Sequence, residues 1–207
     1  MRRLLQSWLL GFVRLIASAR GRYANTPPST QQTIYFANHA SHADTLAILA
    51  ALPLELRAHV RPVAARDYWD ATPLRRFIGS QVLGVVYVTR QSAKREDPLQ
   101  MIREALTEGW SIIVFPEGTR SLTGEIAPFK SGLYRLSSDF PDVKLVPVYL
   151  SDLIRVIPKG RWLPVPINCQ VLFGDPVPGA AGCTKSDFLT RARDAVLHLQ
   201  HSITNKP

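Results

Sequence analysis

Residues 33–52 read TIYFANHASHADTLAILAAL, and this stretch decides the fold class. Its first five residues are mostly β-branched or aromatic, which is typical of a buried strand. Residues 45–52 are apolar and favour a helix. Strands that alternate with helices along a chain indicate an α/β domain. We therefore expect a single α/β domain in which residues 38–44 form the turn between a strand and a helix.

That turn carries a histidine and a carboxylate, His39 and Asp44, five positions apart. At a strand-to-helix turn, His39 can point into a cleft while Asp44, in or near the first helical turn, reaches back to its ring. An aspartate bonded to one ring nitrogen fixes the tautomer and stabilises the imidazolium, which leaves the other nitrogen free to take a proton from a hydroxyl. The pair is therefore a candidate general base with its orienting partner.

Two other interpretations of this turn stay open at the level of the residues. Asn38 and Asp44 can serve only as turn and helix-start residues, beside two solvated histidines. Alternatively, His39, His42 and Asp44 can be the ligands of a metal-dependent hydrolase, because imidazole and carboxylate groups bind first-row metals. The remaining histidines lie in no recognisable ligand motif, and they are His59, His198 and His201.

A second loop carries groups suited to binding a phosphate. Residues 111–115 have the pattern of a buried strand and run directly into Pro-Glu-Gly-Thr-Arg-Ser at 116–121. Loops after strand ends are where α/β proteins build their sites. Gly118 permits close backbone approach, Thr119 supplies a hydroxyl, and Arg120 offers a planar fork that matches a phosphate. A plain Pro-Gly turn with a surface arginine is the simpler interpretation.

Two further cations accompany the predicted elements. Residues 82–88 are expected to form a strand with Arg90 just after its end, and Lys130 follows the second loop. Lys144–Leu150 is another expected strand, although Pro147 should confine it to a sheet edge or to an irregular pairing. The other expected elements are strands at 62–65 and 170–173 and helices at 69–77, at 97–108 and from about residue 186.

Four blocks of the chain resemble those of the glycerolipid acyltransferases, whose bacterial type is 1-acylglycerol-3-phosphate acyltransferase. That family carries, in order, Asn-His-x-Ser-x-x-Asp, Gly-x-x-x-x-x-Arg, Phe-Pro-Glu-Gly-Thr-Arg-Ser and Val-Pro-Val/Ile. The corresponding blocks lie at residues 38–44, 84–90, 115–121 and 146–148, and the resemblance spans residues 30–178. The chain departs from the family in its short length and at the variable positions Ala40, His42 and Ala43, where larger or aromatic residues are common.

The resemblance implies a mixed, mostly parallel sheet flanked by helices, with no cofactor and no metal. It also implies transfer of an acyl group from acyl-CoA or acyl carrier protein to a lysophospholipid, with 1-acylglycerol 3-phosphate giving phosphatidic acid. His39 would be the base and Asp44 its partner. The acceptor would be held by Arg90, Glu117, Gly118, Thr119 and Arg120, with Lys130 as an additional phosphate contact. Another acceptor, such as a lyso-aminolipid, fits the same blocks.

Composition indicates a basic protein with acidic partners. The chain has 207 residues, 46% of them hydrophobic, and its 25 Lys and Arg against 16 Asp and Glu give a net charge of +9. Such a charge suits an anionic membrane surface, acyl-CoA or an acidic carrier protein. No interleaved aromatic-basic motif supports nucleic-acid binding. Cys169 and Cys183 are too few for a disulfide scaffold, and the absence of Gly-x-Ser-x-Gly argues against a serine hydrolase.

Residues 1–22 combine a wide apolar face with five arginines and no acidic residue. This pattern is typical of an amphipathic helix that lies in the membrane interface. We therefore expect an interfacial membrane helix at 1–22, a linker at 23–32 and an acyltransferase domain at 33–207, on the cytoplasmic face of a bacterial inner membrane. Two alternatives stay open: a secretory signal ending near Ala-Ser-Ala at 17–19, and a helix packed on the protein's own core.

Overall fold

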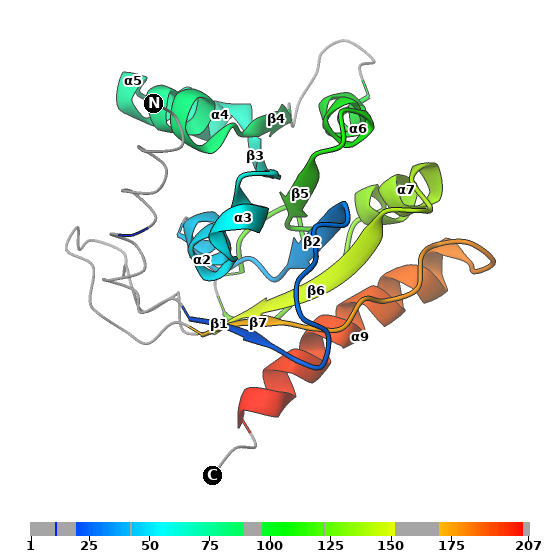
Figure 1. Cartoon of the computed structure of the whole chain (residues 1–207). Helices are drawn as coiled ribbons and strands as arrows, with labels where there is room; N and C mark the ends of the chain where they lie inside the picture. Colours follow the sequence, from blue (N-terminus) through cyan, green and yellow to red (C-terminus); the bar gives the residue numbers. More distant parts are fainter. Residues whose placement is uncertain are drawn as a thin grey trace.

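A seven-stranded sheet forms the centre of the computed structural model, which describes residues 11, 20–41, 43–88, 97–121, 123–151 and 170–204. The strands are β1 (Arg20–Tyr23), β2 (Thr33–Ala37), β3 (Val60–Ala65), β4 (Val86–Val88), β5 (Ser111–Val114), β6 (Lys144–Leu150) and β7 (Gln170–Phe173). Their order is β1-β7-β6-β2-β5-β3-β4. Of these neighbours only β6 and β7 are antiparallel, and the predicted mixed, mostly parallel sheet is confirmed (Figure 1).

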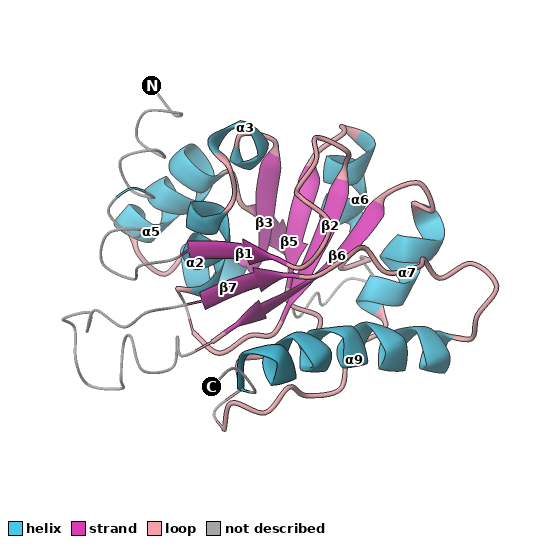
Figure 2. Ribbon diagram, turned by 60° about the horizontal axis from the view of Figure 1, so that its bottom comes forward, coloured by secondary structure: helices cyan, strands magenta, loops and turns pink. Residues whose placement is uncertain are grey.

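Helices cover both faces of the sheet (Figure 2). They are α2 (Asp44–Ala51), α3 (Leu54–Arg57), α4 (Arg66–Trp69), α5 (Pro73–Phe77), the π-helix η1 (Ile78–Leu83), α6 (Gln100–Thr107), α7 (Gly132–Asp139) and α9 (Lys185–Thr204). One core cluster joins α2 and η1 to the sheet, and the other joins α6, α7 and α9 to its opposite face. The fold is therefore a three-layer α/β arrangement.

Burial of side chains on both faces of the central strand β2 fixes the position of its end. Ile34 and Phe36 are buried in the cluster with α6, α7 and α9, whereas Tyr35 and Ala37 are buried in the cluster with α2. Each large apolar side chain that is fully buried contributes about 1.5–3 kcal/mol, and a one-residue slip would move all of them to the wrong face. The register of β2 thus fixes where residues 38–44 leave the sheet.

Strand β6 carries Pro147, and the structure selects one of the two pairings expected for it. The strand lies in the interior of the sheet, so the expectation of an edge position is wrong. The pairing with the chain after β7 is irregular: Phe173 pairs with Val148, Gly174 donates its N–H to the Pro147 carbonyl, and the next bridge joins Val177 to Leu145. Proline, which lacks an N–H, sits where the ladder is interrupted.

Two predicted elements differ from the structure in more than their bounds. The strand expected at 82–88 begins only at Val86, because η1 continues through Leu83 and Gly84 then turns the chain with a φ of 66°. A short apolar run does not distinguish a buried strand from a buried helix. The helix expected at 69–77 is two short helices, and Thr72 caps the second by accepting the N–H of Arg75.

The amino-terminal region differs from the expected helix and linker at one point. Arg20–Tyr23 form β1, which pairs with β7 in parallel, whereas the sequence placed these residues at the end of a helix and the start of a linker. The rest of the interfacial helix predicted at 1–22 lies outside the described residues, apart from Gly11.

Among the helices that the structure describes, none is long and apolar enough to cross a lipid bilayer.

Candidate active site

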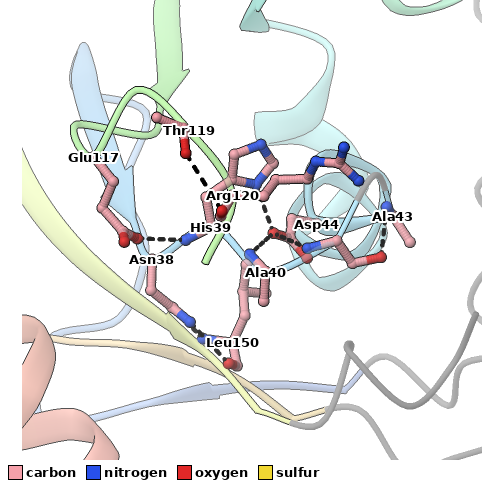
Figure 3. A network of polar contacts seen from close by, with 10 residues as sticks. Asn38, His39, Ala40, Ala43, Asp44, Glu117, Thr119, Arg120 and Leu150 are labelled. Carbon is pink, nitrogen blue, oxygen red and sulfur yellow. Dashed lines mark hydrogen bonds and ion pairs between the residues drawn. The ribbon is translucent and has the colours of Figure 1, made fainter. Parts of the chain in front are cut away.

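His39 and Asp44 meet where β2 ends and α2 begins. Asp44 is the first residue of α2 and is fully buried. Its Oδ2 lies 2.8 Å from Nδ1 of His39 and also accepts the backbone N–H groups of Ala40 and Ser41 at 2.7 and 2.9 Å (Figure 3). Because this oxygen is surrounded by donors, Nδ1 is assigned the ring proton, which leaves Nε2 with a free lone pair. The arrangement has the form of a general base with its orienting carboxylate.

The ring of His39 is held from a second side by Phe115. The two rings are stacked, with centroids 4.2 Å apart and an interplanar angle of 19°. Phe115 directly follows β5, which runs parallel to β2, so the two strands deliver their last residues to the same edge of the sheet. The His39 side chain keeps an exposed fraction of 18%. The ring is therefore fixed in orientation and still open to solvent.

Glu117 contacts the backbone of His39. Its Oε1 accepts the His39 N–H at 2.7 Å (Figure 3). Its Oε2 accepts the Ala127 N–H at 2.9 Å. The side chain is buried, with an exposed fraction of 4%. Burial raises the pKa of the Glu117 carboxyl, and the two backbone N–H contacts oppose that rise. Both oxygens are thus engaged by the protein's own backbone.

The rest of the loop after β5 brings the predicted phosphate-binding groups beside His39. Ser121 donates its N–H to the His39 carbonyl at 2.8 Å, which places the exposed side chains of Thr119 and Arg120 next to the histidine turn. Gly118 has a φ of 73°, and a Cβ there would lie 2.6 Å from Nζ of Lys130. Glycine therefore makes room for the Lys130 side chain, which lies across the loop.

The structure brings together seven of the predicted site residues. They are His39, Asp44, Glu117, Gly118, Thr119, Arg120 and Lys130. Arg90 and His42 lie outside the described residues. Among the residues that are described, no three His, Cys, Asp or Glu side chains gather as a ligand group. The metal-dependent alternative needs His42 as its third ligand, and that residue lies outside the described part. Of its other two ligands, Nδ1 of His39 and Oδ2 of Asp44 are hydrogen-bonded to each other.

Besides the backbone contacts of Glu117 and Ser121, two further supporting contacts were not foreseen from the sequence. The side chain of Asn38 donates to the Leu150 carbonyl at 3.1 Å and accepts the Leu150 N–H at 2.8 Å, which fastens the histidine turn to the end of β6 (Figure 3). The other is the stacking of Phe115 on His39. Asn38 belongs to the same block as His39, but its partner is 112 positions away and leaves no local signal.

An open cleft of about 1120 Å³ adjoins the site. It is bounded by residues 119–121 and 123–128 on one side and by α9 on the other, and Ala40 and Arg120 lie in its wall. Small-molecule sites are commonly concave and of several hundred Å³ or more. The cleft therefore offers space for a substrate group beside the histidine turn.

A family model described as Acyltransferase matches residues 21–151. The chain belongs to the acyltransferase family. The resemblance expected from the four blocks is thus confirmed at the level of the family, and the match contains both His39 and the loop after β5.

Several named proteins are similar to this acyltransferase. The protein of Ovis aries called 1-acyl-sn-glycerol-3-phosphate acyltransferase alpha is 29% identical over 182 residues, covering 86% of this chain and 59% of that protein. The Homo sapiens protein of the same name is also 29% identical, covering 86% of this chain and 60% of its own length. The chain thus spans about 60% of the length of these relatives.

A solved structure shares the fold of this acyltransferase. The crystal structure of the 1-acyl-sn-glycerophosphate (LPA) acyltransferase PlsC from Thermotoga maritima superimposes with a TM-score of 0.74 at 22% sequence identity. The match covers 100% of this chain and 84% of that one. The single α/β domain with its mostly parallel sheet is therefore common to both proteins.

Proposed function

We propose that the protein transfers an acyl group from an acyl thioester to the free hydroxyl of a lysophospholipid, with 1-acylglycerol 3-phosphate as acceptor and phosphatidic acid as product. Family membership and the names of the relatives support the reaction class. The observation that carries the proposal is the contact between His39 and Asp44, because it leaves one ring nitrogen able to accept a proton.

The reaction follows from that arrangement. Nε2 of His39 takes the proton of the acceptor hydroxyl while the hydroxyl oxygen bonds to the thioester carbonyl carbon. The buried carboxylate of Asp44 stabilises the resulting imidazolium. The carbon–sulfur bond then breaks, and the leaving thiolate takes the proton from Nε2. His39 returns to its starting state without a covalent acyl-enzyme.

The acceptor phosphate would be bound by the cations beside His39. Arg120 and Lys130 are exposed and lie on the loop that contacts the histidine turn, and Arg90 would add a third guanidinium. A guanidinium binds phosphate oxygens in pairs. Gly118 and Thr119, in the same loop, would line the acceptor site beside these cations. Glu117 would act by holding the His39 backbone, since both of its oxygens are already engaged.

The donor would be acyl-CoA or acyl carrier protein, and the protein would work at the cytoplasmic face of a bacterial inner membrane. The net charge of +9 supports an anionic surface as partner. The apolar, arginine-rich residues 1–22 support an interfacial helix as the anchor.

The reaction can be tested with purified protein in detergent micelles containing oleoyl-CoA and lysophosphatidic acid. Thiol release and lipid product are followed together. We expect one phosphatidic acid for each thiol released, and no thiol release when the acceptor is omitted. Thiol release at the same rate without an acceptor would show a hydrolase and would overturn the proposal.

A further inference from the structure

The loop between β5 and α7, residues 116–130, binds both backbone polar groups of His39. Glu117 accepts the His39 N–H at 2.7 Å, and Ser121 donates its own N–H to the His39 carbonyl at 2.8 Å. The backbone position of the histidine, and with it the position of the imidazole, therefore depends on where this loop lies.

The same loop is fastened to the carboxy-terminal helix by Arg193. Nε and Nη2 of this half-buried residue of α9 donate to the carbonyl of Ile126 at 3.0 and 2.7 Å. The Ile126 side chain is 3% exposed and packs in the core cluster that contains α9 residues. A charged donor with two N–H groups on one carbonyl is stronger than a neutral hydrogen bond.

One peptide unit connects Arg193 with Glu117. The carbonyl that Arg193 binds and the N–H that Glu117 accepts, those of Ile126 and Ala127, belong to the same peptide bond. Because the peptide group is planar and trans, fixing the direction of its carbonyl also fixes the direction of its N–H. A cation at the carbonyl also polarises the group and strengthens the N–H as a donor.

We propose that Arg193 is a positioning residue for acyl transfer. It orients the peptide between Ile126 and Ala127, that peptide holds the Glu117 carboxylate, and the carboxylate holds the backbone of His39. This inference rests on the proposed function of His39. The family model ends at residue 151, so the Arg193 contact joins α9, which lies beyond the matched part, to the loop that holds the His39 backbone.

The chain offers a matched control in Arg191, two residues earlier on α9. Its Nη2 donates to the carbonyls of Pro178 and Gly179 at 3.1 and 2.9 Å, in a segment that makes no hydrogen bond to the 116–130 loop among the described contacts. Arg193→Ala and Arg191→Ala each remove an arginine that binds backbone carbonyls. They should lower the melting temperature to a similar degree.

The two variants should differ in turnover. We expect Arg193→Ala to lower kcat by about 10-fold or more with little change in the KM of the acceptor, because small displacements of a catalytic group are costly. Arg193 also lies in the wall of the cleft, so a raised acceptor KM with an unchanged kcat would show a direct substrate contact and would overturn the proposal. Arg193→Lys should recover part of the loss, since its ammonium can donate to the Ile126 carbonyl without the fork. Arg191→Ala should keep the wild-type kcat. An Arg193→Ala protein with the kcat of Arg191→Ala would overturn the proposal.

A double-mutant cycle with Glu117→Gln tests the path itself. If Arg193 acts through Glu117, the combined variant should lose less kcat than the product of the two single losses. If the kcat loss of the combined variant equals the product of the two single losses, Arg193 acts independently of Glu117, which would contradict the path. A failure of the proposed function would be recognised by a separate result. His39→Ala would then keep its activity, whatever the kcat of the Arg193 variants.

Discussion

One carboxylate oxygen of Glu117 accepts the backbone N–H of His39 at 2.7 Å, although the two residues lie 78 positions apart in the chain. The other oxygen accepts the N–H of Ala127 at 2.9 Å. The side chain is buried, so water does not compete for these contacts. Glu117 thereby joins the loop after β5 to the turn after β2 at the point where the proposed base lies.

Glu117→Gln should weaken this junction. The amide keeps one acceptor oxygen but turns an NH₂ group toward one of the two backbone donors. A buried N–H left without an acceptor costs about 1–3 kcal/mol, and we expect the free energy of unfolding to fall by that amount and kcat to fall with it. Urea unfolding and initial rates measure both. Glu55→Gln, which replaces an exposed carboxylate of α3 outside the cleft, should change neither, and an unaltered Glu117→Gln protein would refute the two contacts.

Asp44→Asn should lower kcat by about 100-fold or more while the fold persists. The amide oxygen would keep the N–H groups of Ala40 and Ser41 and stay beside Nδ1 of His39. The neutral amide would no longer stabilise the imidazolium that forms when Nε2 takes the proton, so His39 becomes a weaker base. Initial rates and circular dichroism measure the two effects. A fully active Asp44→Asn protein would exclude the pair as the catalytic unit.

Arg120→Ala should raise the KM of the acceptor more than it lowers kcat. A hydrogen bond to a charged group contributes about 1.5–3 kcal/mol, which corresponds to a KM increase of roughly 10- to 100-fold. Arg135→Ala, which removes an exposed arginine from α7, is the control and should keep the wild-type KM. An unchanged acceptor KM in Arg120→Ala would remove this residue from the site.

The hydrogen bonds of Asp175 should make a pH-dependent contribution to the free energy of unfolding. It accepts hydrogen bonds from Thr26 and Asn25, which hold the pKa of its carboxyl below the ordinary value. Because the pKa is lower in the folded state, this stabilisation is present above the unfolded-state pKa and is lost as pH falls through the folded-state pKa. Asp175→Asn should therefore lower Tm more at about pH 7 than at about pH 3.

The control for that series is Asp142→Asn, at an exposed residue of another loop, which should leave Tm unchanged at both pH values. An Asp175→Asn protein that melts with the wild type at about pH 7 would show that the contacts with Asn25 and Thr26 contribute nothing.

Removal of residues 1–19 tests the predicted membrane helix and leaves β1 intact. We expect the shortened protein to remain in solution when vesicles rich in anionic lipid are sedimented, while the full chain sediments with them, because the apolar face and the arginines are lost together. Undiminished binding by the shortened protein would place the membrane contact elsewhere.

The strand β2 and the helix α2 could be predicted because most of their residues are buried and apolar. Strand β1 could not, because Arg20–Tyr23 is a short, polar edge strand that is defined only by its pairing with β7. The run at 82–88 is equally apolar in either conformation, and the left-handed turn at Gly84 decides between them.

Some contacts of the candidate site could likewise be predicted from the sequence, and others could not. His39 and Asp44 are five positions apart, so their contact was foreseen from local geometry. The contacts of Glu117 with His39 and of Asn38 with Leu150 depend on which strands are neighbours in the sheet, and the chain alone does not state this. The residue types of the site were therefore predictable, whereas the role of Glu117 as a backbone contact required the structure.

The most direct measurement is the rate of phosphatidic acid formation from oleoyl-CoA and lysophosphatidic acid by the wild type, His39→Ala and His59→Ala. His59 is an exposed histidine whose ring contacts the Glu55 carbonyl, and its removal should leave the rate unchanged. We expect product from the wild type and His59→Ala and none above background from a folded His39→Ala protein. Phosphatidic acid formed by His39→Ala at the wild-type rate would contradict His39 as the catalytic base.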